Sequence, residues 1–315
     1  MRGGAIDREN VKNADALIIR TRTRCDSKLL EGSTVRLIAT ATIGTDHIDI
    51  PWCEKNGITV TSAPGCNAPG VAQYLFAAIF RSGFDADRHT LGIVGYGNVG
   101  STVGAWARMM EINTIICDPI RKEAGFTDVD YQPLHYVLGE SDIISLHVPL
   151  TFDTPYPTYH LIGENELALM KKNALLVNSA RGGVADEAAL KRFIKDGKIR
   201  LITDVWENEP YIDRELLDLA DIATPHIAGY SLEGKMRGTL MALQSLEKNL
   251  GVKVNLEGLE CWPIIEERIS EQLILKSYNP KNDFAALKAS PSDFERLRNQ
   301  YHFRHEPLFL KDFSD

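Results

Sequence analysis

A short glycine pattern between an apolar run and a helix-like stretch constrains the fold of this 315-residue chain more than any other feature. Residues 95–100 read GYGNVG and follow the apolar run 91–94, and Asp118 stands eighteen residues after Gly100. Glycines at this spacing let a strand turn sharply into a helix and let the backbone approach a pyrophosphate at the helix N-terminus. The pattern predicts a dinucleotide-binding βαβ unit. Asp118 favours NAD over NADP, because it would bond the ribose and repel a 2′-phosphate.

Short apolar runs alternate with helix-like stretches along most of the chain. The runs that are typical of buried strands are 16–19, 35–40, 57–60, 91–94, 114–117, 143–146, 174–177, 200–203 and 222–224. Helical stretches such as 71–80 and 187–195 lie between them. This alternation predicts an α/β protein with a doubly wound parallel sheet and a second α/β unit before it. The polar residues 81–90 would form the hinge between the two.

The charge balance limits the kinds of ligand that the chain can bind. The net charge is -8 and the sequence pI is near 5.6, so neither a nucleic-acid nor an anionic-membrane partner is expected. An anionic ligand would need a local cluster of cations. Arg20, Arg22 and Arg24, after the first apolar run, could form one, although a solvated charged loop is the alternative.

Two further features indicate the cellular setting. Apolar stretches such as 74–80 are far shorter than the ~20 residues that cross a bilayer. The five cysteines are scattered and form no C-x-x-C pair, as is typical of reduced thiols in a cytosolic protein.

Three polar residues, each after a different expected strand, are candidates for the chemistry: Arg181, Glu209 and His226. The carboxyl ends of parallel strands meet at one edge of a sheet, so these side chains can converge. A histidine can take the proton of an alcohol as hydride leaves, a carboxylate can orient the ring, and a guanidinium can hold a substrate carboxylate. Each alone could be an ordinary loop residue. With the glycine loop, they predict a dehydrogenase.

The series Gly95, Asp118, Arg181, Glu209 and His226 resembles the D-isomer-specific 2-hydroxyacid dehydrogenases over most of the chain. Three strings are more specific, namely 40–47, 63–68 and above all HIAGYSLEGK at 226–235. They resemble a subgroup that uses NAD to oxidise 4-phospho-D-erythronate to 2-oxo-3-hydroxy-4-phosphobutanoate in pyridoxal phosphate biosynthesis.

The resemblance implies roles for individual residues. Arg181 and Glu209 match the active-site pair of the family, and His226 matches its proton donor. Substrate contacts are expected from Thr21, Thr42 and Tyr230, to which the charge argument adds Arg20. Cofactor contacts are expected from Gly95, Tyr96, Gly97, Asn98, Val99, Gly100, Asp118, His147, Val148, Pro149, Ser179, Ala180, Asp204 and Gly229. We expect no metal site.

The resemblance also implies a domain plan. Residues 1–85 would form a flavodoxin-like substrate domain that lacks the first strand and helix of its relatives, and residues 86–229 the Rossmann-type NAD domain. Residues 230–255 would return to the substrate domain as a helix, and 256–315 would form a small C-terminal dimerisation segment. A cytoplasmic homodimer is therefore expected.

Two other functions stay open at this point. One is a different D-2-hydroxyacid dehydrogenase, acting on a substrate such as 3-phosphoglycerate or glyoxylate. The other is an NAD-sensing interaction protein of the corepressor kind. The sequence also leaves open whether NADH is released or is reoxidised in place by a 2-oxo acid.

Overall fold

The computed structural model describes residues 6–84, 88–256 and 268–307. By its internal contacts the chain divides into two compact units, of which unit 1 comprises 1–67 and 231–264, and unit 2 comprises 68–230 and 265–315. The chain therefore passes between the units three times: after residue 67, after residue 230 and after residue 264. The expectation of a hinge at 81–90 is wrong, because the residues on both sides of that segment belong to unit 2.

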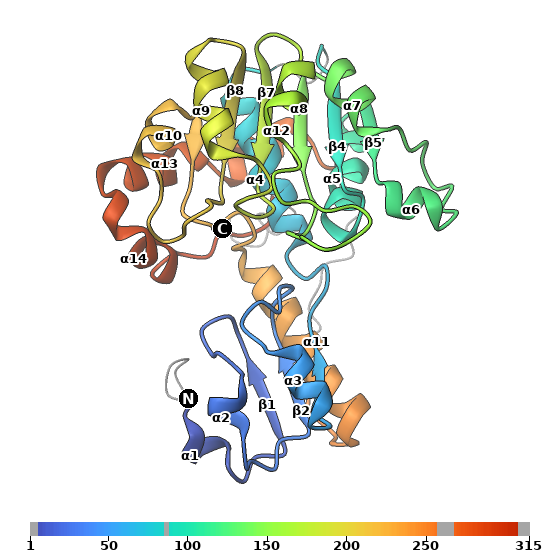
Figure 1. Ribbon diagram of the computed structural model, residues 1–315, viewed down its shortest axis with the longest axis vertical. Helices are drawn as coiled ribbons and strands as arrows, with labels where there is room; N and C mark the ends of the chain where they lie inside the picture. Colours follow the sequence, from blue (N-terminus) through green and yellow to red (C-terminus); the bar gives the residue numbers. More distant parts are fainter. Residues whose placement is uncertain (1–5, 85–87, 257–267, 308–315) are drawn as a thin grey trace, which may run out of the picture. The chain divides into compact units, whose positions relative to one another are not determined.

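Unit 1 contains a three-stranded parallel sheet in the order β1-β2-β3, formed by Ala16–Ile19, Leu37–Thr40 and Thr59–Thr61. Its helices are α1 (Arg8–Val11), α2 (Ser27–Leu30), α3 (Ile50–Lys55) and α11 (Leu232–Leu250). Helix α11, drawn in orange in Figure 1, packs against β2. Gly238 permits this close packing, because a Cβ there would lie 2.6 Å from the carbonyl oxygen of Ala41.

Unit 2 is built on a six-stranded parallel sheet in the order β5-β4-β6-β7-β8-β9 (Figure 1). The strands are β4 (Leu91–Val94), β5 (Thr114–Cys117), β6 (Ile143–Leu146), β7 (Ala174–Asn178), β8 (Ile199–Thr203) and β9 (Ile222–Ala223). The strand order reverses at β4, since β5 lies on one side of it and β6 on the other. In sheets of this kind, ligands bind at the carboxyl ends of the strands beside such a switch point.

Buried apolar side chains fill both faces of this sheet, as parallel sheets require. The helices of unit 2 that precede the C-terminal segment are α4 (Ala68–Arg81), α5 (Asn98–Met109), α6 (Pro119–Glu123), α7 (Leu134–Glu140), α8 (Glu164–Leu169), α9 (Glu187–Lys195) and α10 (Arg214–Leu219). Successive strand residues point to opposite faces of the sheet, and Ile93 and Val94 accordingly belong to different core clusters. Helix α4 packs on α5 and is buried along nearly its whole length, so it lies with unit 2 and not with the first domain as expected from sequence.

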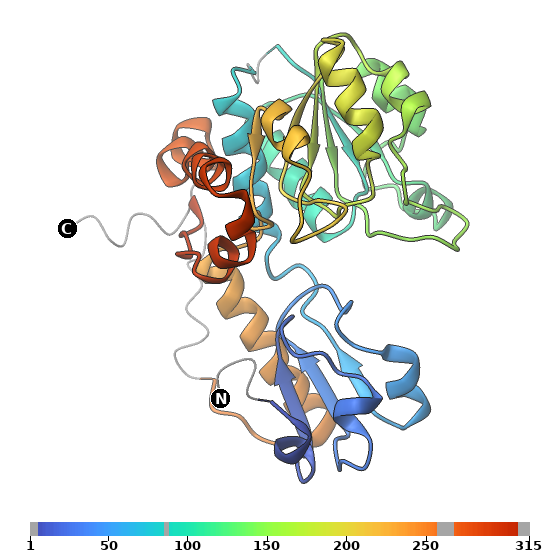
Figure 2. The same cartoon turned by 60° about the vertical axis from the view of Figure 1, so that its left-hand side comes forward.

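The C-terminal segment packs onto unit 2. Its elements are α12 (Glu271–Ser277), α13 (Pro280–Ala289), a 3-10 turn (Pro291–Asp293) and α14 (Phe294–Asn299). Helix α12 contacts α4, and α13 contacts both α4 and β9, as the red helices in Figure 2 show. The side chains of Ile274, Leu287 and Phe294 are fully buried against the rest of the unit. A dimerisation role for this segment stays a prediction.

Two further observations concern the described residues. Cys25, Cys53, Cys66 and Cys117 are buried and form no disulfide among the described residues, whereas Cys261 lies outside those residues. Among the helices of the ranges given above, none combines the length and apolarity needed to cross a membrane.

The docking of the C-terminal segment can be tested by truncating one buried ring. We expect Phe294→Ala to lower the free energy of unfolding by about 3–5 kcal/mol, because it removes a large side chain from a packed core. Tyr211 is 86% exposed, so Tyr211→Ala is the matched control and should change stability by less than ~0.5 kcal/mol. Urea denaturation of both variants measures the difference, and equal stabilities would mean that Phe294 is not packed in the core.

Candidate active site

The glycine loop after β4 has the shape that a pyrophosphate needs. Gly95 has φ 89°, and a Cβ there would lie 2.7 Å from the carbonyl oxygen of His147. A Cβ at Gly100 would collide with the carbonyl of Gly95, whereas a Cβ at Gly97 would meet nothing within 4 Å. The first and third glycines are thus required by packing. The second leaves backbone open for a ligand at the start of α5, where helix N–H groups favour negative charge.

Asp118 directly follows β5 and is hydrogen-bonded to the glycine loop. One carboxylate oxygen accepts from the backbone N–H of Tyr96 at 2.8 Å, and the other accepts from the N–H of Arg121 at 3.0 Å. The second bond caps α6. Each oxygen has a further lone pair, so the carboxylate can also accept from a ribose hydroxyl, and that role stays a prediction.

Other residues assigned to the cofactor lie in the loops after β6 and β7. The backbone of His147 and the side chain of Val148 lie against Gly95, with Pro149 next in the chain. Burial lowers the pKa of His147 to about 3, so this ring is neutral at pH 7 and hydrogen-bonds Ser145. The hydroxyl of Ser179 is buried and has no hydrogen-bond partner among the described residues.

These features fit a dinucleotide. Gly97 leaves open space at the loop, and Ser179 supplies an unsatisfied hydroxyl directly after β7. The backbone N–H of the adjoining Ala180 is instead held by Asn178 at 3.1 Å. The side chain of Tyr96 is buried in the core, which leaves only its backbone for ligand contact.

The centre of the site is a histidine–carboxylate pair. The Nδ1 atom of His226 lies 2.7 Å from Oε2 of Glu209, and both side chains are partly exposed. A carboxylate only accepts hydrogen bonds, so Nδ1 carries the proton in the neutral ring and Nε2 is its basic nitrogen. The other oxygen of Glu209 accepts from the N–H of Trp206 at 3.1 Å, which fixes the carboxylate in place.

The electrostatics of Glu209 keep it ionised. Burial alone would raise the pKa of Glu209, but the hydrogen bond and charge of His226 outweigh this effect. The N–H of Trp206 and the charge of Arg298 act in the same direction, so the pKa is held below its usual value. A carboxylate that stays ionised can stabilise the imidazolium formed when Nε2 takes a proton.

A buried carboxylate shapes the loop that carries His226. Asp204 is 1% exposed and accepts from the N–H groups of Ile227 and Ala228, both at 2.8 Å, and from the hydroxyl of Thr224 at 2.6 Å. Burial raises the pKa of Asp204, and these partners oppose that effect. His226 itself has φ 58°, a conformation that its neighbours must maintain. The observed partners of Asp204 thus belong to the loop, and its expected cofactor contact stays a prediction.

Arg181 lies in a loop that contacts the loop of Glu209. It follows β7, and its Nη1 donates to the carbonyl of Ala180 at 2.8 Å. The next residue, Gly182, packs directly on the backbone of Trp206, because a Cβ there would collide with its carbonyl. The loop of Arg181 and the loop of Glu209 are therefore in contact, as the sequence argument expected for residues at one edge of the sheet.

The expected substrate residues belong to both units. Tyr230 ends unit 2, close after His226 and Gly229, whereas Thr21, Thr42 and Arg20 lie in unit 1. Nη2 of Arg20 donates to the carbonyl of Lys235 and to the hydroxyl of Thr239, both at 2.9 Å, and Nη1 donates to the carbonyl of Ala41. Thr42 bonds the hydroxyl of Thr40 at 2.6 Å, and Thr21 is exposed. Arg24 is paired with Asp26 at 3.1 Å.

Sequence reasoning gave no role to three basic residues near these groups. Burial, followed by the charges of Arg20 and Arg22, lowers the pKa of Lys235 to about 8. Arg298 donates from Nε to the hydroxyl of Tyr230 at 3.1 Å, and Arg304 is buried against the loop of His226. Lys235 is the last residue of the specific string 226–235, and its place in that string was the sequence signal that could have identified it as a site residue. For Arg298 and Arg304 the sequence offered no such signal.

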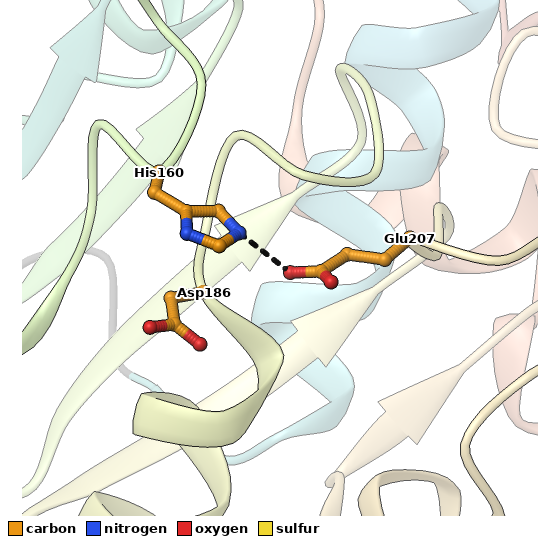
Figure 3. A group of neighbouring side chains, drawn as sticks. All are labelled: His160, Asp186 and Glu207. Atoms are coloured by element: carbon orange, nitrogen blue, oxygen red, sulfur yellow. Dashed lines mark hydrogen bonds and ion pairs between the residues drawn. The ribbon is translucent and has the colours of Figure 1, made fainter.

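One group of side chains has the composition of a metal site (Figure 3). His160, Asp186 and Glu207 each offer one ligand atom, and these atoms lie within 4.8 Å of one another. Their atoms already have other partners: Asp186 caps α9, and Oε1 of Glu207 accepts from His160 at 3.0 Å and from the N–H of Glu187 at 3.2 Å. These bonds join three loops that follow β6, β7 and β8, and we assign the group that structural role.

Comparisons with known proteins agree with this geometry. Residues 75–228 match the family model described as D-isomer specific 2-hydroxyacid dehydrogenase, NAD binding domain. The chain is 43% identical over 306 residues to an erythronate-4-phosphate dehydrogenase of Bacteroides fragilis, covering 95% of this chain and 88% of that protein. It is 42% identical to the enzyme of the same name from Porphyromonas gingivalis, covering 97% and 86%. The chain belongs to the D-isomer-specific 2-hydroxyacid dehydrogenases.

Solved structures extend the likeness. The dehydrogenase is similar to a D-lactate dehydrogenase from Aquifex aeolicus complexed with NAD and lactic acid, with a TM-score of 0.65, 29% identity and coverage of 79% and 86%. It is also similar to an NAD⁺-bound 3-phosphoglycerate dehydrogenase from Entamoeba histolytica, with a TM-score of 0.65, 29% identity and coverage of 78% and 83%. The parallel-sheet fold, the NAD cofactor and the dehydrogenase activity expected from sequence are confirmed.

Loss of the imidazole should separate catalysis from cofactor binding. We expect His226→Ala to lower turnover by about two to four orders of magnitude, the range for loss of a general base, with little change in NAD affinity. His135 is an exposed residue of α7, so His135→Ala is the control and should keep full turnover. Steady-state rates and the dissociation constant of NAD are measured for each. A turnover number in His226→Ala equal to that of the control would remove His226 from the mechanism.

The cofactor preference tests the position of Asp118. We expect Asp118→Asn to relax the rejection of NADP, because the charge that repels a 2′-phosphate is lost while one acceptor remains. Asp118→Ala should also weaken NAD, since the bonds to the glycine loop and to α6 are lost as well. The ratio of kcat/KM for the two cofactors measures both effects. Equal use of NAD and NADP by the unmodified enzyme would show that Asp118 does not read the ribose.

Proposed function

We propose that this dehydrogenase oxidises 4-phospho-D-erythronate to 2-oxo-3-hydroxy-4-phosphobutanoate with NAD, in pyridoxal phosphate biosynthesis. The observation that carries the proposal is the string 226–235, which places the base His226 and the cation Lys235 in one short segment. The relatives named erythronate-4-phosphate dehydrogenase, at 42–43% identity over most of both chains, support the same reaction.

The reaction gives each candidate site residue of unit 2 a role. Arg181 binds the substrate carboxylate through its planar guanidinium. His226 takes the C2 hydroxyl proton at Nε2, and Glu209 keeps the ring oriented and stabilises its cation through Nδ1. The glycine loop, Asp118 and Ser179 would hold NAD, whose nicotinamide would accept the hydride from C2. One hydride and one proton leave the alcohol, which becomes the 2-oxo group.

We assign the phosphate group of the substrate to unit 1. Burial lowers the pKa of Lys235 most, and Arg20 and Arg22 lie close enough for their charges to lower it further. A group of like charges is costly by itself, and a doubly charged phosphate would relieve the repulsion. Lactate and glyoxylate carry no phosphate group for these cations to bind. The cluster of cations therefore favours a phosphorylated acid as the substrate. A 3-phosphoglycerate dehydrogenase is the competing enzyme of the same chemistry.

The setting completes the proposal. We propose that the enzyme works as a homodimer in the cytoplasm, without nucleic-acid or membrane partners. The acidic net charge supports the absence of polyanionic partners. The NAD-sensing interaction protein is the alternative of a different class. The His226–Glu209 pair favours the enzyme, because a sensor needs no oriented base.

A comparison of substrates tests the proposed function. We expect kcat/KM for 4-phospho-D-erythronate to exceed that for 3-phospho-D-glycerate, D-erythronate and D-lactate, each measured with NAD at pH 7. Lys235→Met should raise KM for the phosphorylated acid and leave the low activity on D-erythronate unchanged. Lys248→Met, on the exposed far end of α11, is the control.

The pH dependence supplies a second measure of the same proposal. Only protonated Lys235 attracts phosphate, and its pKa is about 8. KM for 4-phospho-D-erythronate should therefore rise as the pH passes above about 8, and Lys235→Met should remove this rise. Faster oxidation of 3-phospho-D-glycerate would identify the alternative enzyme, and no turnover of any of these acids would favour the sensor.

A further inference from the structure

The strongest unassigned feature is a buried arginine in the C-terminal segment. Arg304 is only 9% exposed, yet its guanidinium donates to many acceptors of unit 2. Nε donates to Oε1 of Gln73 at 2.9 Å, and Nη2 donates to the carbonyl of Gly70 at 3.0 Å, both in α4. The guanidinium also lies over the ring of Tyr278, 4.2 Å from its centroid.

Three further bonds of Arg304 reach the catalytic loop, and Nη1 also donates to the hydroxyl of Tyr301 at 3.2 Å. Nη1 donates to the carbonyls of Ile227 at 3.1 Å and Tyr230 at 3.2 Å, and Nη2 donates to the carbonyl of Ala228. Three of the four residues that directly follow His226 therefore give their carbonyls to one guanidinium.

The opposite side of the same loop is held by Asp204. That carboxylate accepts from the N–H groups of Ile227 and Ala228, while Arg304 donates to their carbonyls. A buried carboxylate and a buried guanidinium thus bind the N–H groups and the carbonyls, respectively, of the same two residues. Charge-assisted bonds of this kind are strong, so the conformation of the segment that directly follows His226 is tightly determined.

We propose that Arg304 is a positioning residue for catalysis, which acts by holding residues 226–230 so that His226 keeps its bond to Glu209. The C-terminal segment is then part of the catalytic machinery of its own chain, besides any role in assembly. The inference rests on the proposed function only for the role of His226 as base. The positions of the loop and of Arg304 do not depend on which acid is the substrate.

A purely structural role for Arg304 would have different consequences, and a second arginine makes the distinction possible. Arg81, at the end of α4, donates to the carbonyl of Leu275 at 3.0 Å and so ties the C-terminal segment to α4. Its bonds do not involve residues 226–230. Loosening the segment at Arg81 should lower stability without changing the loop.

The first experiment observes the loop without any substrate. Arg304→Lys and Arg81→Lys are prepared with ¹⁵N-histidine, and the Nδ1–H signal of His226 is assigned among the eight histidines by its loss in His226→Gln. Lysine supplies three donors in a different geometry and cannot reproduce the fork of arginine. We expect this signal to shift or broaden in Arg304→Lys and to be unchanged in Arg81→Lys. An unchanged signal in both variants would overturn the inference.

The second experiment measures rates. We expect Arg304→Lys to lower kcat about ten- to hundred-fold, the cost of misplacing a catalytic group by about 1 Å, with the NAD dissociation constant within about two-fold of normal. Arg81→Lys should keep the normal kcat even if its melting temperature falls as much as that of Arg304→Lys. Equal kcat values in the two variants would overturn the inference, since stability alone would then explain Arg304.

A rescue experiment covers poor folding of the lysine variant. In Arg304→Ala, added guanidinium at tens of millimolar should restore part of kcat, and ethylammonium at the same concentration should not. Restoration by both cations, or by neither, would contradict a specific role of the guanidinium. Should 4-phospho-D-erythronate prove not to be the substrate, the histidine signal would still decide the inference, and the proposed function would fail separately.

Discussion

The hydrogen bond between His226 and Glu209 is the interaction on which the rest of the site depends. It fixes the proton on Nδ1, leaves Nε2 as the base and holds a carboxylate beside the cation that forms. Neither residue holds this arrangement alone. Glu209 is fixed by the N–H of Trp206, and His226 keeps its left-handed backbone because Asp204 binds the peptide groups that follow it.

The fold brings these groups together through parallel strands. Arg181, Glu209 and His226 follow β7, β8 and β9, which are neighbours in the sheet, so residues distant in sequence end at one edge. The glycine loop lies at the switch point between β4 and β6, where a dinucleotide can approach open backbone. Chemistry and cofactor binding thus depend on the same edge of one sheet.

Much of this could be predicted from sequence, because parallel strands are short apolar runs and the glycine loop has a fixed spacing. The runs at 91–94 and 143–146 coincide with β4 and β6. The membership of α4 in unit 2 could not be predicted, since a helix buried on all sides carries no signal for the unit that buries it. Arg304 was missed for a related reason. Its partners in the catalytic loop are backbone carbonyls of residues more than 70 positions away, and every residue has a carbonyl, so the sequence carries no signal for them.

The turnover number of Glu209→Gln, measured beside its dissociation constant for NAD, tests the central claim most directly. The account predicts that kcat falls, since the amide no longer stabilises the cation that forms when His226 takes the proton, and that the affinity for NAD is kept. A variant whose kcat matches that of the unmodified enzyme would contradict the account.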